Sequence, residues 1–311
     1  MRFRKTLLLG LALACSALPR LSAAETLRVM TFNIWVGGES GNQPLAQTAA
    51  VIKTARADLV GLQEKRGAER PDGTRPENGR LIAEMLGWHY FDQGGGSTAI
   101  LSRYPIVSNT PNKWGACLQL PSGQKIWHFN VHFPASPYQP YQLLNIPYGD
   151  APFIKTAGQA VSEARRSRGP QVRELLAELE PVLADGPIVF LTGDFNEPSF
   201  QDWTERAAAA KIVPLAVPYP ATMAVASTGL RDAYRAFHPD EVARPGWTWT
   251  PITTPDDPKD RHDRIDFLYF SGPGLVLTQC EIVGENQKFA DLVVQPYPSD
   301  HRAVVATFEL R

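Results

Sequence analysis

The sequence predicts an α/β protein whose strands and helices pack as layers of one domain. Short apolar runs rich in β-branched and aromatic residues are typical of buried strands, and they alternate along the chain with segments of helical spacing. No internal repeat, low-complexity tract or interdomain linker interrupts this order. The chain of 311 residues is long enough for one large domain, and its charged fraction of 20% is that of a globular protein.

The individual elements follow from the periodicity of the apolar residues. Alternating or continuous apolar runs predict strands, in chain order, at 27–33, 58–64, 97–103, 105–108, 125–132, 187–194, 264–270, 276–283 and 303–310. Helical spacing predicts helices at 44–57, 77–86, 159–183, 199–210 and 230–237. Residues 134–158 and 214–228 lack a clear period, and the first of these is rich in Pro, Tyr and Gly, so both are expected to be irregular.

The first 24 residues have the layout of a secretory signal peptide. A basic leader at 1–5 precedes an apolar stretch at 6–18, and small residues at 22–24 form a cleavage site before Glu25. The apolar stretch is too short to span a bilayer as a helix, so no transmembrane segment is expected. Processing as a lipoprotein at Cys15 is the alternative. The sequence therefore predicts a periplasmic or secreted protein with one domain at 25–311.

Removal of the leader changes the charge of the chain. It takes away four of the 31 basic residues and none of the 32 acidic ones, which leaves a formal charge of −5. This balance disfavours polymeric nucleic acid as the substrate, although a local basic patch would suffice to bind it. Two cysteines remain, Cys117 and Cys280. We expect two separate buried thiols, with a disulfide as the alternative in an oxidising compartment.

The central predicted strand ends in the sequence GDFN at 193–196. Asp194 and Asn196 are two residues apart, so their side chains point the same way at the end of the strand. A carboxylate beside a carboxamide suits a hard cation, a water nucleophile or a phosphoryl oxygen. An Asx turn after a strand is the simpler alternative for this stretch alone.

Other predicted strands also carry polar side chains at or near an end. These residues are Asn33, Glu64, His132, Asp266, Asp300 and His301. Each has a simple explanation by itself, such as a turn cap or an ion pair, but the repetition indicates a shared polar site.

The motifs that contain these residues, taken in order, resemble those of the endonuclease/exonuclease/phosphatase superfamily, the DNase I-like proteins. They are TFN at 31–33, QE at 63–64, ILSRYPI at 100–106, NVH at 130–132, GDFN at 193–196, RID at 264–266 after Trp249, and SDH at 299–301. The resemblance covers nearly the whole chain after the leader. It implies a four-layered α/β sandwich of two facing mixed sheets flanked by helices, with a phosphoesterase site at one edge of the sheets.

The resemblance also implies a divalent-metal site. Glu64 resembles the metal-binding glutamate of the family, and Asn33 and Asp300 resemble its neighbours at that site. Mg²⁺ fits, or Mn²⁺, because such an ion takes few carboxylates and keeps water and phosphate oxygens as its other ligands. Some members carry an aspartate where this chain has Trp35, so a second metal is in doubt. Trp35 is expected in the core, with a wall of the substrate site as the alternative.

The remaining motif residues resemble the catalytic groups of the family. Asp194 and Asn196 resemble the pair that positions the attacking water and holds the phosphoryl group. His301 resembles the site histidine and Asp266 its carboxylate partner, which would fix the imidazole tautomer. His132 matches a position that faces the phosphate. The sequence leaves open whether Asp194 or His301 takes the proton of the water.

Together these features predict an exported, metal-dependent phosphoesterase that hydrolyses a small-molecule or lipid phosphodiester or monoester by water attack. A secreted nuclease acting on DNA or RNA is the alternative, and a binding module without turnover is a third hypothesis. We expect a monomer. Residues 134–158 follow His132 directly and contain Tyr138, Tyr141 and Tyr148. They either cover the core or form an aromatic wall that selects the substrate, with Lys155 or the arginines at 165–168 contacting a second anion.

Overall fold

The computed structural model describes residues 25–311. The predicted signal peptide at 1–24 lies outside the described residues. Within the described part of the chain, every helix is too short or too polar to cross a bilayer.

Two β-sheets form the centre of the molecule. The strands of the first are β1 (Glu25–Asn33), β2 (Leu59–Gln63), β3 (His89–Asp92), β4 (Thr98–Ser102), β11 (Leu275–Gly284), β12 (Leu292–Val293) and β13 (Ala303–Leu310). Their order across the sheet is β12, β11, β13, β1, β2, β4, β3, with β1 parallel to β2 and antiparallel to β13.

The second sheet contains six strands. They are β5 (Ile106–Asn109), β6 (Gly115–Gln119), β7 (Lys125–His132), β8 (Ile188–Asp194), β9 (Arg231–Asp232) and β10 (Asp266–Ser271). They lie in the order β5, β6, β7, β8, β10, β9, with β7 parallel to β8 and β10 antiparallel to it.

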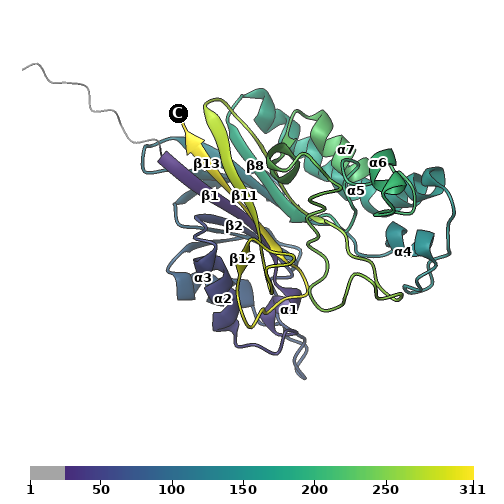
Figure 1. Ribbon diagram of the computed structural model, residues 1–311. Coiled ribbons are helices and arrows are strands. Elements are labelled where there is room, and N and C mark those ends of the chain that lie inside the picture. The colour runs from purple at the N-terminus through teal and green to yellow at the C-terminus, as the bar shows by residue number, and fades with distance from the viewer. Residues whose placement is uncertain (1–24) are drawn as a thin grey trace, which may run out of the picture.

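Helices cover the outer faces of both sheets, which confirms the predicted four-layered sandwich (Figure 1). The helices of the described chain are α1 (Trp35–Gly38), α2 (Leu45–Thr54), α3 (Asn78–Leu86), α4 (Gln139–Leu144), α5 (Ala157–Ala184), α6 (Glu205–Ala209), α7 (Pro220–Ser227) and α8 (Ala233–Phe237). Helices α2 and α3 bury Ile52 and Ile82 against the first sheet. Helices α5 and α7 bury Leu175 and Val225 against the second.

The space between the sheets changes character along the strands. At the start of β1 and β8 the inward side chains are apolar, and Phe190 of β8 lies 5.0 Å from Phe308 of β13 between ring centroids. Further along, the inward positions become polar, and Gln63 Nε2 donates to Asn130 Oδ1 at 2.6 Å. Because residues at i and i+2 share a face, the same strands line an apolar core at one end and a polar edge at the other.

Glycine is required at two places in the sheets, at Gly61 between them and at Gly193 within the second sheet. A Cβ at Gly61 would lie 2.0 Å from Thr192 Oγ1, and one at Gly193 would lie 2.6 Å from the backbone oxygen of Val131. Gly193 therefore lets β8 approach β7 closely just before Asp194, which helps to fix the position of that carboxylate.

The structure departs from the sequence prediction mainly in short elements. Strands β3, β6, β9 and β12 were not predicted. None of them is longer than five residues, and each is defined by its partners in the sheet. The segment expected to be irregular at 134–158 contains α4, and the one at 214–228 contains α7. The helix expected at 199–210 is confined to α6, which begins after Thr204, whose side chain accepts from Ala207 N.

The two cysteines of the described chain are unpaired. Cys117 lies on β6 and Cys280 on β11, in different sheets, and both are buried. This confirms the expectation of two separate thiols.

Candidate active site

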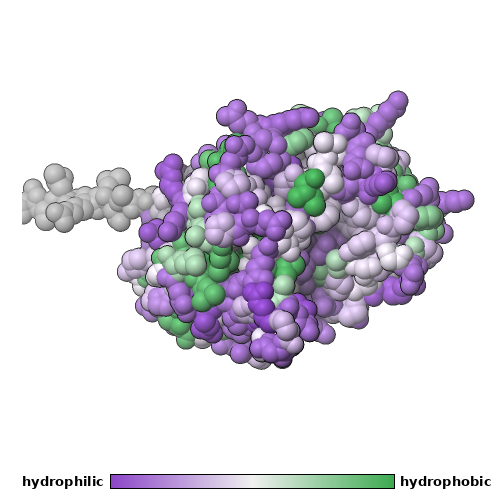
Figure 2. All heavy atoms as spheres, turned by 90° about the horizontal axis from the view of Figure 1, so that it is seen from below, coloured by the Kyte–Doolittle hydropathy of each residue, from purple (hydrophilic) through white to green (hydrophobic). Residues whose placement is uncertain are grey.

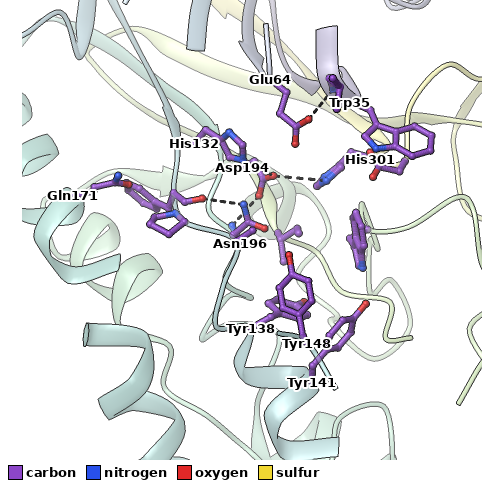
Figure 3. A pocket seen from close by; sticks show the side chains of 17 residues that line it. Trp35, Glu64, His132, Tyr138, Tyr141, Tyr148, Gln171, Asp194, Asn196 and His301 are labelled. Carbon is purple, nitrogen blue, oxygen red and sulfur yellow. Dashed lines mark hydrogen bonds and ion pairs between the residues drawn. The ribbon is translucent and has the colours of Figure 1, made fainter. Parts of the chain in front are cut away.

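A cavity of about 560 Å³ opens at the edge of the sheets where β1, β2, β7 and β8 end. Figure 2, which views the molecule from below Figure 1, shows that this face is hollowed. Strand-end polar groups form the floor of the cavity, and aromatic side chains form a wall on one side (Figure 3).

The topology of the second sheet brings its catalytic candidates together. His132 ends β7 and is paired in register with Asp194, which ends the parallel strand β8. Strand β10 lies on the other side of β8 from β7. Because β10 runs antiparallel to β8, its first residue, Asp266, is in register with Asp194. Three residues that are far apart in the sequence therefore lie side by side on three adjacent strands.

Asn33 joins the two sheets at this edge. Its Nδ2 donates to Asp194 Oδ2 at 2.9 Å and to Glu64 Oε1 at 3.2 Å. Its Oδ1 accepts from the backbone N–H of Trp35 at 3.0 Å, and Ser299 Oγ donates to its carbonyl at 2.7 Å. The amide thus holds the two carboxylates at a fixed separation.

His301 lies between two carboxylates. Its Nδ1 is 2.9 Å from Asp266 Oδ2, and its Nε2 is 3.8 Å from Asp194 Oδ2. Burial disfavours the charged imidazole, but Asp266 and Asp194 outweigh that cost and raise the pKa of His301 to about 10. The ring of Trp249 packs against the imidazole with centroids 4.9 Å apart, which shields it from solvent.

Asp194 is the group that the others share. It is 1% exposed, and His132 Nε2 lies 3.6 Å from its Oδ2. Burial raises the pKa of Asp194 and Asp266 adds to the rise, while His301 and His132 oppose it. The backbone N–H of Asn196 donates to Asp194 Oδ1 at 2.8 Å, which fixes the rotamer of the carboxylate.

Asn196 lies in the left-handed region with a φ of 49°, a conformation that asparagine tolerates better than most residues. Its Nδ2 donates to the carbonyl of Phe133 at 3.0 Å. The side chain of Asn196 therefore ties the end of β8 to the segment after β7, and it also lines the cavity.

Glu64 and Asp300 lie together at the other side of the floor, and both line the cavity. Glu64 Oε2 accepts from Val36 N at 2.7 Å. Asp300 Oδ1 is buried without a hydrogen-bond partner. Burial raises the pKa of the Asp300 carboxyl to about 7, and the charge of Glu64 contributes to the rise.

An unpartnered buried oxygen beside a second carboxylate fits a hard divalent cation, which prefers oxygen ligands. A different group, Asp194, Asp266 and His301, also has ligand atoms within 4.8 Å of one another. Its His301 Nδ1 and Asp266 Oδ2 already form a hydrogen bond with each other. The Glu64 and Asp300 pair therefore fits Mg²⁺ or Mn²⁺ better.

The structure thus brings every predicted site residue to one edge, although their individual roles stay predictions. Trp35 was expected in the core, but it is half-buried and lines the cavity, so the alternative of a wall holds. The arginine prediction is wrong for Arg168, which is fully buried and donates to the carbonyls of Ala135 and Pro137 at 3.3 and 3.0 Å. Its charge supports the chain after β7 and does not reach the cavity.

Three residues have roles at the site that the sequence did not predict. Ser97 Oγ hydrogen-bonds His132 Nδ1 and so orients the other ring nitrogen toward Asp194. Trp249 covers His301, and Ser299 holds Asn33 in place. Ser299 and Trp249 stand in or beside the motifs, a signal that could have pointed to them, but Ser97 carries no such signal.

Two facing sheets with carboxylates, amides and histidines converging at one edge form a site that suits phosphoester hydrolysis. The chain belongs to the endonuclease/exonuclease/phosphatase family, whose model matches residues 30–301. Members of this family act on phosphoester bonds and depend on divalent metals.

Individual relatives agree with this membership. An uncharacterized protein of Caenorhabditis elegans is 30% identical over 327 aligned positions, which cover 97% of each chain. The crystal structure of an endonuclease/exonuclease/phosphatase from Beutenbergia cavernae has a TM-score of 0.57 at 19% identity, covering 92% of this chain and 72% of that one. A family protein from Bacteroides thetaiotaomicron has a TM-score of 0.54 at 15% identity, covering 93% and 100%. At these identities the two solved structures support the fold alone.

Proposed function

We propose that the chain is a divalent-metal-dependent hydrolase of a small-molecule or lipid phosphate ester, which it cleaves by water attack. The observation that supports this most strongly is the position of Asp194 on the cavity floor. Its Oδ2 accepts a hydrogen bond from Asn33 Nδ2 at 2.9 Å, and the Nε2 atoms of His132 and His301 lie 3.6 and 3.8 Å from the same oxygen. A buried carboxylate that borders the cavity and is fixed by donors suits a group that orients a water molecule.

In the proposed mechanism, Asp194 orients the attacking water and accepts its proton. His132 and His301 donate from Nε2 to the phosphoryl oxygens, where negative charge develops. Asn196 donates the N–H of its amide that Phe133 does not use. Asp266 holds Nδ1 of His301, so that the Nε2 atom faces the reacting group.

Glu64 and Asp300 would hold the metal, and Asn33, which was expected as a third ligand, would position Glu64 through its Nδ2. A bound divalent cation neutralises charge on the phosphoryl oxygens in the transition state. The unpartnered Asp300 Oδ1 and the carboxylate of Glu64 are the protein atoms best placed to bind it.

A substrate panel with and without metal tests this function. We expect chelation with EDTA to abolish hydrolysis of bis-p-nitrophenyl phosphate, and Mg²⁺ or Mn²⁺ to restore it. Glu64→Gln should raise the metal concentration needed for half activity by at least tenfold, because removing even a partner of a metal ligand costs about 10- to 100-fold in metal affinity. Glu84→Gln is the matched control, because Glu84 is exposed on α3.

The panel also includes p-nitrophenyl phosphate, sphingomyelin and plasmid DNA. Plasmid DNA as the best substrate would move the assignment to a secreted nuclease. Full turnover in chelated protein would contradict the metal requirement, and binding without turnover of any ester would leave a binding module.

We further propose that residues 1–24 are removed on export and that the product is a periplasmic or secreted monomer. The basic, apolar and small-residue regions of the leader support this. Intact-mass analysis of the exported protein should give a chain that starts at Glu25, and light scattering should give the mass of one chain. An intact leader in the cell fraction would contradict the proposed location.

A further inference from the structure

One wall of the cavity is built from tyrosines in series. Tyr138 and Tyr141 meet edge to face with ring centroids 5.0 Å apart, and Tyr141 meets Tyr148 in the same way at 5.8 Å. All three line the cavity, as do Trp249 and Trp35. Figure 3 shows the three tyrosines grouped together on the side of the cavity away from Glu64.

The hydroxyls of the two inner tyrosines are already used. Tyr138 Oη donates to Asp263 Oδ2 at 2.8 Å, and Tyr141 Oη donates to Asp260. Asp263 is itself fixed by Trp203 Nε1 at 3.0 Å. Because their polar ends are held in the loop behind them, these tyrosines are fixed in orientation and offer carbon surface to the cavity.

The cavity is lined mainly by acidic and uncharged side chains. Among the described residues that line it, none is Lys or Arg, whereas Glu64, Asp194 and Asp300 are acidic. A bound metal and His301 would balance one phosphate group at the reaction centre, but a second anion on the aromatic side would meet no Lys or Arg among the described residues that line this cavity. This favours an uncharged group on the aromatic side of the substrate.

Two cavities meet at the proposed reaction centre. A polar groove of about 640 Å³ shares His132 and Gln171 with the tyrosine-lined cavity. A phosphodiester held at His132 therefore has one arm on the aromatic side and room for a second arm on the polar side, whereas a monoester would leave the groove unused.

We propose that the tyrosine wall, defined as Tyr138, Tyr141 and Tyr148, binds an uncharged planar ring carried as one arm of a phosphodiester substrate. This inference rests on the proposed phosphoesterase function. The fixed edge-to-face rings complement an added ring, which can continue the series by stacking or edge contact. A flexible alkyl arm would fill the same space without that complementarity and would lose more rotamer freedom on binding.

Phosphinates test the wall apart from turnover, because their phosphorus–carbon bonds are not esters. The probes are diphenylphosphinate, dibutylphosphinate and dimethylphosphinate, measured by calorimetry on the full chain with Mg²⁺ present. We expect diphenylphosphinate to bind at least tenfold more tightly than dimethylphosphinate and more tightly than dibutylphosphinate.

Tyr148→Leu and Tyr141→Leu keep an apolar side chain and remove the ring. We expect each to reduce the preference for the diphenyl probe over the dibutyl probe by at least threefold. Tyr148 is 41% exposed, so its substitution should leave the fold intact even if Tyr141→Leu does not. Phe153→Leu is the matched control, since Phe153 is 51% exposed in the same segment but does not line the cavity.

Several outcomes would overturn the inference. They are equal or tighter binding of dibutylphosphinate, an unchanged preference in Tyr148→Leu, an equal loss in Phe153→Leu, or no binding of any probe. The proposed function fails separately, if wild-type protein with metal hydrolyses no phosphate ester while the ring preference persists. Hydrolysis without ring preference would leave the function standing and refute the wall.

Discussion

The two ends of the space between the sheets are built by the same strands, but one end is an apolar core and the other is the polar floor of the cavity. On β7, the inward side chains run from Ile126 through His128 and Asn130 to His132. Ile126 belongs to the apolar core, whereas His132 faces Asp194 in the cavity. One alternating strand can therefore supply both stability and chemistry, with the change from apolar to catalytic side chains spread over two or three inward positions.

Asp194→Asn should give the largest loss at the polar end. The amide keeps the shape of the side chain but cannot accept a proton, so kcat on bis-p-nitrophenyl phosphate should fall by about 10²- to 10⁴-fold. Calorimetry should show a folded protein, because the variant relieves a buried charge. Asp185→Asn, at an exposed position after α5, is the control. Near-normal turnover of the Asp194 variant would remove Asp194 from the mechanism.

Asp266→Asn should give a smaller loss at the same end. Asp266 acts through His301, whose Nδ1 it holds at 2.9 Å. Losing such an orienting partner lowers activity by about 10- to 100-fold. The effect should appear in kcat with KM nearly unchanged, since Asp266 is not among the residues that line the cavity. An equal rise in KM would indicate that Asp266 contacts the substrate directly.

His128→Gln tests the middle of β7, where burial affects stability and not catalysis. Burial lowers the pKa of His128 from 6.5 to about 3. His128 is therefore protonated near pH 6.5 in the unfolded chain but stays neutral at that pH in the folded protein. Its contribution to the free energy of unfolding is present above pH 6.5 and is lost as the pH falls below it. Between pH 6.5 and 5 this loss is about 2 kcal/mol.

In His128→Gln, this part of the acid sensitivity should disappear, while the hydrogen bond to Thr192 Oγ1, 2.8 Å long in the wild type, can be kept. Urea midpoints at the two pH values measure the difference. His89→Gln, exposed on the edge strand β3, should retain the wild-type slope. Parallel pH dependence in the wild type and His128→Gln would show that His128 is not the group responsible.

Ile126→Val should have the smallest effect and should confine it to stability. Removing one buried methyl group from the apolar end of β7 costs about 0.5–1.5 kcal/mol. Denaturant unfolding should show this loss, and kcat should stay within twofold of the wild type. A large loss of activity would mean that the two ends of the strand are coupled more tightly than their separate chemistry indicates.

The sequence predicted the polar residues at the cavity end of the strands better than it predicted the full architecture. Asp194 and Asn196 were identifiable because they stand two residues apart at the end of a clear apolar strand. The order of the strands was not, since pairing such as that of Asp266 with Asp194 depends on contacts far apart in the chain. Family resemblance supplied the sandwich, and periodicity alone supplied only α/β layers.

The parts that escaped prediction share one physical cause. Strand β6 is short and begins with glycine, so its ladders with β5 and β7 are what identify it as a strand. Ser97 acquires its role from the distant His132. The tyrosines at 138–148 were recognisable as aromatic, but their orientation depends on Asp260 and Asp263, more than a hundred residues away. Local sequence cannot encode such partners visibly.

Arg168 has a consequence for how substrate enters. Its guanidinium holds Gln139 Oε1 at 2.8 Å and the carbonyls of Ala135 and Pro137 from inside the fold. If the segment at 135–139 moved outward, the guanidinium of Arg168 would be left buried without partners, so local opening of this segment should be rare. The segment would therefore move together with α5 and not as a lid, and a ligand would meet a preformed tyrosine wall. Its amide hydrogens would then exchange about as slowly as those of the helix behind it.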